Sequence, residues 1–304
     1  MAIALAICAA LCNALTTIFQ RLGVETAPDP AEHGLGLLWH AVRRPVWIFG
    51  LLMMVGSFGF QAAALGFGSL SVVQPLMPAE LVFLVVILRV WFKRTLGVRE
   101  ALGTALTVGG LSCFLALSDA GGGNRIPTGA EWVLVTAVCG GALLACMAMA
   151  RTGSRTWRSA WFGASAAIAF AITAAFTKST MTLLGHGIGQ VFTHWEPYAI
   201  AIGGLIGLVL TQNSFHAGPI TASQATLTIV DPIVSIVIGV GLFGDQLKGG
   251  VGSLALDALA LVVMSGGLLV LSQSPLVAGA ESSEALGPAL RGEPERPFPE
   301  VPSS

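Results

Sequence analysis

The stretch that decides the fold is LSVVQPLMPAELVFLVVILRVWF, residues Leu70–Phe92. It is apolar and long enough to cross a lipid bilayer as a helix. It also contains one carboxylate, Glu80, and a charged group at bilayer depth costs about 2.5 kcal/mol or more, so we interpret this residue as part of a functional site. Pro75 and Pro78 precede it and lack backbone N–H donors, which predicts two carbonyl groups without helical partners. These carbonyl groups belong to Ser71 and Gln74.

A second stretch, ITASQATLTIVDPIVSIVIGVGLF at Ile220–Phe243, repeats this pattern. It carries Asp231 within one position of a 150-residue offset from Glu80, and Pro232 follows directly, which predicts a free carbonyl at Thr228. Its polar residues recur at three- and four-residue steps, so they form one stripe that should face water, substrate or other helices. Hydrogen bonding between helices is the alternative interpretation, and it is weaker for the aspartate. The stripe consists of Thr221, Gln224, Thr228, Asp231 and Ser235.

The composition places the whole chain in a membrane. Hydrophobic residues make up 54% of the sequence, charged residues only 10%, and the mean hydropathy is +0.80, values that exclude a soluble globular domain. The net charge of −1 carries no information about partners, because the position of each charge matters more than the sum. All five cysteines lie in apolar runs without a C-x-x-C spacing, so we expect them to pack as small hydrophobic residues.

Nine apolar segments predict an all-α integral membrane protein with nine transmembrane helices. The last four segments resemble the first four in order, and one connector lies between the two sets. Because four is even and the connector crosses once, the second set enters the membrane from the opposite side, which makes an inverted repeat. The predicted units are the first repeat (1–122), the connector helix (123–155), the second repeat (156–273) and a disordered cytoplasmic tail (274–304). The segments are Ala2–Gln20, Pro45–Phe67, Leu70–Phe92, Val98–Leu117, Glu131–Ala150, Ser159–Thr180, Pro197–Ala217, Ile220–Phe243 and Gly252–Ser272.

Smaller features add to this layout. We predict that Leu35–Val42 forms a short helix at the membrane interface, with Trp39 as its anchor. Glycine pairs at 109–110 and 266–267 occupy matching positions in the fourth helix of each repeat. Paired small residues allow two helices to approach closely, so we expect both pairs to lie at helix contacts.

The positively charged residues predict the orientation, since Lys and Arg in short loops mark the cytoplasmic side. With nine helices, twelve of the fifteen Lys and Arg residues fall on the face that holds the C-terminus. We therefore predict a protein of the cytoplasmic membrane with its N-terminus outside and its C-terminus in the cytoplasm. The twelve are Arg21, Arg43, Arg44, Arg89, Lys93, Arg94, Arg99, Arg151, Arg155, Arg158, Arg291 and Arg296, and the other three are Arg125, Lys178 and Lys248.

The polar residues of the predicted helices define a candidate cavity between the two repeats. Amides and hydroxyls orient a polar solute without the desolvation cost of fixed charges, so we expect a small polar metabolite or amphiphile as substrate. Asp231 is the first candidate for proton coupling, because a carboxylate in the membrane interior can take up and release a proton, and Glu80 is the second. Alternatively, Glu80 pairs with a cation on another helix, such as Lys178 or Arg21. The predicted substrate-binding residues are Asn13, Thr17, Gln61, Gln74, Gln212, Asn213, Gln224 and Thr228.

At this level of pattern the chain resembles the drug/metabolite transporter superfamily. The similarity runs from Ala4 to Leu271 and rests on four-helix repeats whose third helix carries glutamine and proline. The nine-span layout looks most like the NIPA-like magnesium transporter branch, which is related to the ten-span EamA-type transporters. The resemblance implies the nine-helix fold and a transport function. Its clearest local stretches are WIFGLLMMVGSFGFQAAALGFGSLSVVQPL at 47–76 and QNSFHAGPITASQATLTIVDPI at 212–233.

The chain departs from the NIPA-like pattern at acidic positions. Ser57 follows the glycine of the second span where the pattern has an acid, and Lys93 stands where an acid follows the third span. Asp245 retains the corresponding acid in the second half. A divalent cation needs several oxygen ligands, including carboxylates, so these departures argue against magnesium as the substrate and leave the fold inference unchanged.

Other classes of function fit the sequence less well. The histidines lie in loops or near span ends, and the sequence has no H-E-x-x-H motif and no nucleophile elbow, so we expect neither an enzyme nor a cofactor. A NIPA-like magnesium or other divalent cation transporter and a non-transporting scaffold or regulator are the alternatives. The expected partners are the lipid bilayer and a small-molecule or cation substrate, with no nucleic acid and with a homodimer as an open alternative. The histidines are His33, His40, His186, His194 and His216.

Overall fold

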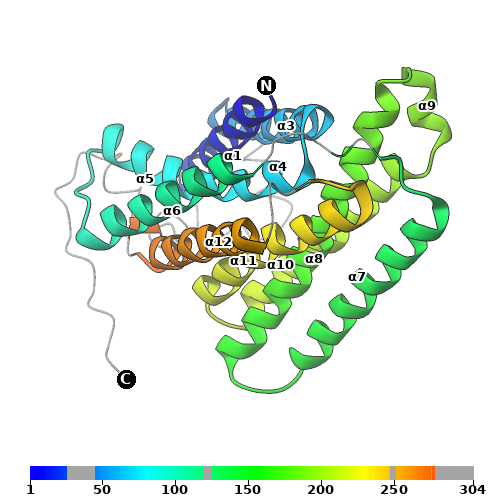
Figure 1. Cartoon of the computed structure of the whole chain (residues 1–304). Helices are drawn as coiled ribbons and strands as arrows, with labels where there is room; N and C mark the ends of the chain where they lie inside the picture. Colours follow the sequence, from blue (N-terminus) through cyan, green and yellow to red (C-terminus); the bar gives the residue numbers. More distant parts are fainter. Residues whose placement is uncertain (26–44, 119–122, 124, 247–250, 275, 278–304) are drawn as a thin grey trace.

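The structure, a computed structural model, describes residues 1–25, 45–118, 123, 125–246, 251–274 and 276–277. Every regular element in these residues is a helix, and nine helical segments are long and apolar enough to cross a membrane (Figure 1). The described part of the chain is therefore all-helical, and its nine apolar helices indicate a membrane protein, as the composition predicts. The predicted interfacial helix at Leu35–Val42 and all but the start of the predicted tail lie outside the described residues.

The observed helices follow the predicted segments closely. Helix α6 begins and ends at the predicted residues, whereas α8 extends four residues beyond each predicted end and α1 continues to Glu25. A short helix between α8 and α10 had no counterpart in the prediction. The elements are α1 (Ala2–Glu25), α3 (Pro45–Phe67), α4 (Leu70–Leu76), the 3₁₀ turn η1 (Met77–Ala79), α5 (Glu80–Val90), α6 (Val98–Leu117), α7 (Gly129–Met149), α8 (Arg155–Leu184), α9 (Ile188–Thr193), α10 (Glu196–Ala217), α11 (Ile220–Ile238), the π-helical turn η2 (Gly239–Phe243) and α12 (Val251–Ser272).

Local capping explains where helices α7 and α8 begin. The Thr128 hydroxyl accepts a hydrogen bond from the backbone N–H of Glu131, whose carboxylate in turn accepts from the backbone N–H of Thr128 at 2.8 Å. This capping box satisfies two backbone donors at the start of α7. Ser154 caps α8 by accepting from the backbone N–H of Trp157 at 3.3 Å. Both caps bond to a backbone N–H three residues further along the chain, so they are local signals.

The first acid-bearing span is interrupted in its middle. Pro75 and Pro78 break it into α4 and α5, with η1 between them, and Glu80 becomes the first residue of α5. The prediction of a free carbonyl at Gln74 is wrong, because the backbone N–H of Met77 donates to it. A tighter 3₁₀ turn replaces the lost α-helical bond and satisfies this carbonyl locally.

The second acid-bearing span remains helical through Pro232 and ends in the π-helical turn η2. Gly244 stops the helix with φ at 68°, in the left-handed region that glycine occupies without a steric penalty. The backbone N–H of Asp245 then donates back to the Gly239 carbonyl at 3.0 Å. This compact ending directs the Asp245 side chain toward the helices behind it.

The helices pack in pairs. Helix α1 lies against α3, α8 against α10, and α6 against α12, while α11 contacts α8 and α4. The Ser57 hydroxyl of α3 donates to the Ala9 carbonyl of α1 at 2.9 Å, which joins the first pair. Helix α7 contacts mainly α8 and lies at the margin of the bundle in Figure 1, where most of its side chains are exposed.

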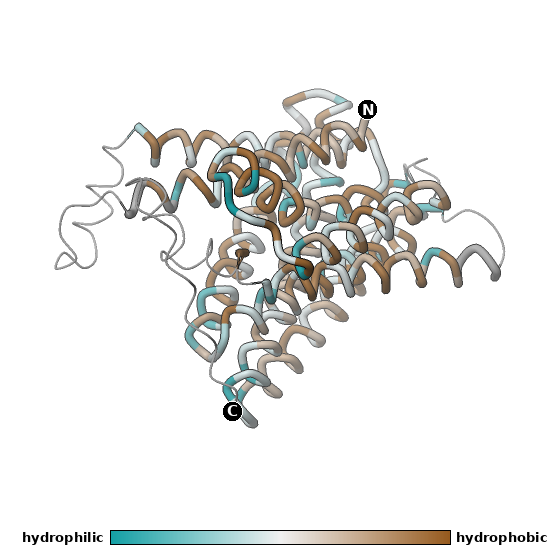
Figure 2. The backbone as a smooth tube through the Cα atoms, turned by 90° about the vertical axis from the view of Figure 1, so that its left-hand side faces the viewer, coloured by the Kyte–Doolittle hydropathy of each residue, from teal (hydrophilic) through white to brown (hydrophobic). Residues whose placement is uncertain are grey.

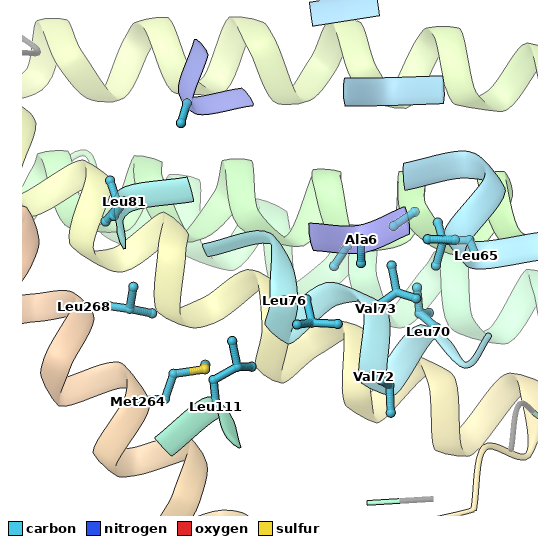
Figure 3. Close-up of a cluster of buried hydrophobic side chains, with 14 of the residues drawn as sticks. Ala6, Leu65, Leu70, Val72, Val73, Leu76, Leu81, Leu111, Met264 and Leu268 are labelled. Atoms are coloured by element: carbon cyan, nitrogen blue, oxygen red, sulfur yellow. The ribbon is translucent and has the colours of Figure 1, made fainter. Parts of the chain in front are cut away.

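Helix α4 lies at the centre of this arrangement. All seven of its residues are buried, and its apolar side chains meet those of α1, α3, α6 and α12 (Figure 3). Burial of such side chains stabilises a helix bundle mainly through close packing in a membrane protein. The labelled members of this cluster are Ala6, Leu65, Leu70, Val72, Val73, Leu76, Leu81, Leu111, Met264 and Leu268.

One glycine of each predicted pair lies at a helix contact. A Cβ atom at Gly110 would lie 2.5 Å from the Met264 nitrogen, and one at Gly267 would lie 2.5 Å from the Thr107 nitrogen. Gly109 and Gly266 have open space at the same positions. Helices α6 and α12 therefore approach each other through Gly110 and Gly267, as small residues allow.

The outer surface of the bundle is apolar. Large hydrophobic side chains such as Leu52, Val133 and Leu205 are more than half exposed, a pattern expected where lipid surrounds a protein. Figure 2 shows hydrophobic residues along most of the length of the long helices, with hydrophilic residues gathered at their ends and in short interior segments.

Candidate functional site

A cavity of about 420 Å³ lies among six of the membrane-spanning segments. Its wall combines amides, hydroxyls and two carboxylates with aromatic and aliphatic side chains, and none of the lining residues is Lys, Arg or His. The lining residues are Asn13 of α1; Phe58 and Gln61 of α3; Gln74, Met77, Pro78 and Glu80 of the first interrupted span; Phe170, Thr173, Ala174 and Thr177 of α8; Ile200, Ala201, Gly204 and Leu205 of α10; and Leu227, Thr228 and Asp231 of α11.

Glu80 reaches the cavity because the break in its span places it at the start of α5. There the side-chain amide of Asn13 donates a hydrogen bond to one of its carboxylate oxygens. This contact joins α1 to α5 across 67 positions of sequence. The hydrogen bond from Asn13 therefore helps to hold this carboxylate in the cavity wall.

Asp231 enters the same cavity from α11. The Ser235 hydroxyl, one turn further along the helix, donates to its Oδ1 atom at 3.3 Å. One turn before it, the Thr228 hydroxyl donates to the Gln224 carbonyl at 2.7 Å, which directs its oxygen lone pairs away from its own backbone. The polar stripe predicted for this helix thus contributes Thr228 and Asp231 to the cavity lining.

Gln74 is the most deeply buried amide of the site, with 1% of its surface exposed. Its Nε2 group has no hydrogen-bond partner among the described residues. A buried amide donor without a partner costs about 1–3 kcal/mol. Because Gln74 lines the cavity, a bound molecule that carries an acceptor oxygen would satisfy this donor.

Two hydroxyl groups of α8 complete the polar wall, and the sequence analysis did not single them out. Thr173 and Thr177 donate to the backbone carbonyls of Ala169 and Thr173, at 2.6 and 2.9 Å, one turn before each of them. Their i, i+4 spacing places both on one face of α8. That spacing was visible in the sequence, but an alanine-rich helix with scattered Ser and Thr residues does not indicate which face meets a cavity.

The structure brings together six of the ten predicted site residues. Asn13, Gln61, Gln74, Glu80, Thr228 and Asp231 line the cavity, whereas Thr17, Gln212, Asn213 and Gln224 lie outside its lining. Gln212 shares a face of α10 with Gly204 and Leu205 but lies two turns further along the helix, past the end of the cavity, where it is exposed. The Thr17 hydroxyl donates to the Asn13 carbonyl at 3.3 Å. Helical periodicity thus indicates on which face of a helix a residue lies, but not whether the residue is level with the cavity along the helix axis.

A buried ion pair lies beside the cavity. Lys178 of α8 donates to the Oδ1 atom of Asp245 at 2.9 Å. The same carboxylate accepts from the backbone N–H and the hydroxyl of Ser71, at 3.0 and 2.9 Å, and from the backbone N–H of Gly123 at 3.1 Å. The Lys178 ammonium also lies 4.8 Å from the centre of the Phe243 ring, within range of a cation–π interaction. We call this set the Lys178–Asp245 network.

The Lys178–Asp245 network corrects one predicted pairing. Lys178 was a candidate partner of Glu80, but the structure pairs it with Asp245 instead. Two residues of the network follow or precede cavity-lining residues in the sequence. Lys178 comes directly after Thr177, and Ser71 lies one turn before Gln74. The network joins α8, the end of the second acid-bearing span and the start of the first, and these are three of the six segments that line the cavity.

Comparison with known proteins gives one informative match. An uncharacterized protein of Corynebacterium glutamicum is 27% identical over 288 residues, which cover 91% of this chain and 98% of the relative. The match therefore extends over all but a small part of both chains, and the relative is similar in length. No protein-family model matches the chain, and no solved structure matches it.

Proposed function

We propose that this chain is a secondary transporter that moves a small organic solute across the cytoplasmic membrane by proton-coupled alternating access. The observation that carries the proposal is that Glu80 and Asp231, one on each interrupted or proline-bearing span, line a single cavity. Carboxylates inside a membrane are costly and occur mostly on substrate or ion pathways. A scaffold requires neither the cavity nor the two acids.

The drug/metabolite transporter architecture with an inverted repeat belongs to the same proposal. It is supported by the pairing of α1 with α3 and of α8 with α10, which are the first two helices of each set of four. It is also supported by the contacts of α6 with α12 and of α4 with α11, since equivalent helices of two repeats meet about a two-fold axis. The charge distribution supports the orientation with the N-terminus outside and the C-terminus in the cytoplasm.

The cavity wall supports a substrate class. Phe58, Phe170 and Leu227 supply apolar surface, while the two carboxylates and the Gln74 amide supply polar contacts. With two acids and no basic residue in the lining, the site repels anions and accepts a neutral or positively charged solute. The substrate we propose has an apolar part, an acceptor oxygen for Gln74 and no net negative charge.

Asp231 is the proposed coupling residue. Protonation would remove its charge and weaken any hold on a polar or cationic solute, so a proton and the solute would compete for one site. Glu80 is the second candidate, although its contact with Asn13 gives it a structural role as well. In alternating access, the cavity would open first to one side of the membrane and then to the other around these two residues.

Magnesium transport is the second candidate function, and one observation weighs against it. Ser57 occupies the position where the NIPA-like pattern has an acid, yet it is buried against α1 with its hydroxyl bonded to the Ala9 carbonyl. That position is absent from the cavity lining, so the carboxylates available there are Glu80 and Asp231. A magnesium ion prefers an octahedral shell of oxygen ligands, which these two acids would only partly supply.

A stabilisation screen followed by a transport assay tests the proposal. The purified protein would be heated in detergent with Mg²⁺, Mn²⁺ and a panel of amino acids, nucleosides, polyols and small amines. Compounds that raise the melting temperature would then be tested for uptake into proteoliposomes with and without a proton gradient. We expect an organic compound to be accumulated only with the gradient. Stabilisation and uptake of Mg²⁺ alone would favour the second candidate, and no uptake of any compound would favour a scaffold.

A further inference from the structure

A second pocket lies on the opposite face of α8 from the cavity. Its volume is about 250 Å³, and it is bounded by the last turns of α8, the beginnings of α7 and α10, and the segment before α7. Ser179, Thr182, Leu183 and His186 line it at i, i+3, i+4 and i+7 spacing, which is one helix face. At 100° per residue, that face points away from the face that carries Thr173 and Thr177 into the cavity. The two sites are therefore separate.

Aromatic rings form one wall of this second pocket. Trp132 of α7 lies 5.4 Å from Trp195 and 6.2 Å from Phe243 between ring centres, in edge-to-face geometry. Trp132 and Phe243 are buried, whereas 47% of the Trp195 surface is exposed at the mouth of the pocket. The faces of such rings are electron-rich and attract a cation, whereas their edges are electron-poor, and tryptophan is the best of the aromatic residues at holding a cation.

A buried carboxylate lies in the wall of the same pocket. Glu196 is the first residue of α10 and is only 6% exposed. Its Oε1 atom accepts a hydrogen bond from the Ser179 hydroxyl at 3.3 Å, while its Oε2 atom has no partner among the described residues. The backbone N–H groups at the start of α10 favour the negative charge. One acceptor thus remains unsatisfied inside an aromatic pocket.

The basic residues in and beside this pocket have other partners. Lys178, which precedes Ser179, is paired with Asp245, and Arg125 is paired with Glu131. The two histidines of the lining also have contacts elsewhere: Nδ1 of His186 lies 3.0 Å from the Thr182 carbonyl oxygen, and Nδ1 of His194 lies 3.3 Å from the Thr193 hydroxyl. A buried charge without a partner of opposite sign is strongly destabilising, so the pocket lacks one positive charge. From the buried acceptor, the aromatic wall and the small volume, we propose that this pocket binds an alkylammonium group, with Glu196 as its counter-ion and hydrogen-bond acceptor.

Two kinds of molecule carry an alkylammonium group that could reach this pocket. One is a soluble amine, and the other is the ammonium group of a phosphatidylethanolamine headgroup, because the pocket lies where three membrane-spanning helices begin or end. The ligand carries N–H bonds in either case, since the free Oε2 atom requires a donor. A quaternary ammonium such as choline has no N–H bond at its charged nitrogen, so its charged group cannot donate to Oε2 and it would bind less tightly.

Titration of the purified protein with ethanolammonium chloride tests the proposal, with choline chloride and sodium chloride at equal ionic strength as controls. We expect a saturable rise in melting temperature with ethanolammonium, at least several-fold weaker binding of choline and no saturable effect of sodium. Glu196→Gln, which keeps the side-chain shape, should weaken ethanolammonium binding tenfold or more. Trp195→Ala, at a half-exposed position, should also weaken it.

Glu100→Gln serves as the matched control because it removes a buried carboxylate that lines neither the cavity nor the second pocket. It should leave ethanolammonium binding unchanged. The proposal is overturned if the wild-type protein shows no saturable binding, if Glu196→Gln binds as tightly as wild type while it elutes as a folded protein, or if only Glu100→Gln loses binding. Failure of the transporter proposal leaves these outcomes unaffected, because they require no transport.

Nanodiscs distinguish the two sources. In discs of pure phosphatidylcholine, ethanolammonium should bind as it does in detergent. If the headgroup is the natural ligand, discs that contain phosphatidylethanolamine should suppress the ethanolammonium titration, and Glu196→Gln should remove the difference between the two lipids. If a soluble amine is the natural ligand, both lipids should give the same titration.

Discussion

The ammonium group of Lys178 lies 2.9 Å from the Oδ1 atom of Asp245, and only 3% and 4% of the two residues are exposed. Backbone and hydroxyl donors from Ser71 and Gly123 occupy further positions on the same carboxylate. The pair therefore satisfies the two conditions under which a buried ion pair is tolerated, which are close geometry and additional hydrogen bonds.

Loss of the Asp245 charge should destabilise the protein. Asp245→Asn keeps the side-chain shape but leaves the Lys178 ammonium buried without a counter-ion, at a cost of about 3–5 kcal/mol in the free energy of unfolding. Combining it with Lys178→Met should recover part of that loss. Unfolding in mixed micelles would measure the stability of the single variant and of the double variant. The control is Arg125→Gln, which breaks the exposed pair with Glu131 but keeps the Thr128–Glu131 capping box, and it should leave stability unchanged. An equal loss of stability from Asp245→Asn and from Arg125→Gln would contradict this prediction.

The glycines between α6 and α12 give a matched test of the fold. Gly110→Ala places a Cβ atom against the Met264 backbone and should lower the free energy of unfolding by about 1–3 kcal/mol. Gly109→Ala adds the same atom where nothing lies within 4 Å and should be neutral or slightly stabilising, because alanine favours a helix. Thermal unfolding in one detergent would compare the two variants. Equal loss from both would mean that these helices do not pack through Gly110.

Replacement of Gln74 should weaken solute binding without lowering the stability of the protein. Gln74→Met removes a buried donor that has no partner and keeps the side-chain length, so the free energy of unfolding should stay the same or rise by about 1 kcal/mol. The same variant should bind the transported solute at least tenfold more weakly, since each factor of ten equals about 1.4 kcal/mol. Thermal unfolding and ligand titration on one preparation would separate the effects. A large loss of stability would show that Gln74 serves the packing instead.

Removal of the Asp231 charge should separate coupling from exchange. If Asp231 carries the coupled proton, Asp231→Asn should abolish uptake driven by a pH gradient while leaving solute exchange and folding intact. Proteoliposomes with labelled solute on one or both sides would measure the two activities. Glu80→Gln is the matched variant from the first half. If Asp231→Asn retains pH-driven uptake and Glu80→Gln loses it, Glu80 is the coupling residue instead. If both variants retain pH-driven uptake, the proposal of proton coupling is wrong.

The proposed orientation has a direct test by cysteine labelling. In a background without the five native cysteines, an impermeant reagent should reach a cysteine at Gly122 from outside and cysteines at Ala31, Thr152 and Ser282 only from the cytoplasmic side. Thr152 is preferable to its neighbour Gly153, whose φ of 99° disfavours any side chain. Any other pattern of accessibility would contradict the orientation with the N-terminus outside.

The sequence predicted the membrane spans because each one is a long local signal. The bounds of α6 and of the second acid-bearing span, Ile220–Phe243, agree with the prediction to the residue. Helix α8 was predicted too short, because its Arg155–Arg158 start and its Thr182 end are polar although helical. Polar residues at the ends of a membrane helix resemble loop residues in composition, and only capping by Ser154 separates them.

The partners of the site residues were harder to predict. Periodicity correctly placed Thr228 and Asp231 on one face of α11. It also led us to predict Gln212 and Gln224 as substrate-binding residues, although neither lines the cavity. In a membrane helix, lipid-facing and buried faces are both apolar, so hydropathy does not indicate which polar residues lie at the depth of a cavity. The pairing of Lys178 with Asp245, 67 positions apart, follows from how α8 and η2 pack and has no local signal.

The span of sequence between Lys178 and Asp245 has a consequence for biosynthesis. A ribosome completes α8 well before it reaches Asp245, so the lysine enters the membrane without its counter-ion and carries an insertion cost of about 2.5–3.5 kcal/mol. The backbone N–H groups of Ser71 and Gly123 likewise lack this acceptor until Asp245 has been synthesised. A nascent chain that stalls before η2 therefore carries an unneutralised lysine in α8, and the completed chain is the first form in which this charge is paired.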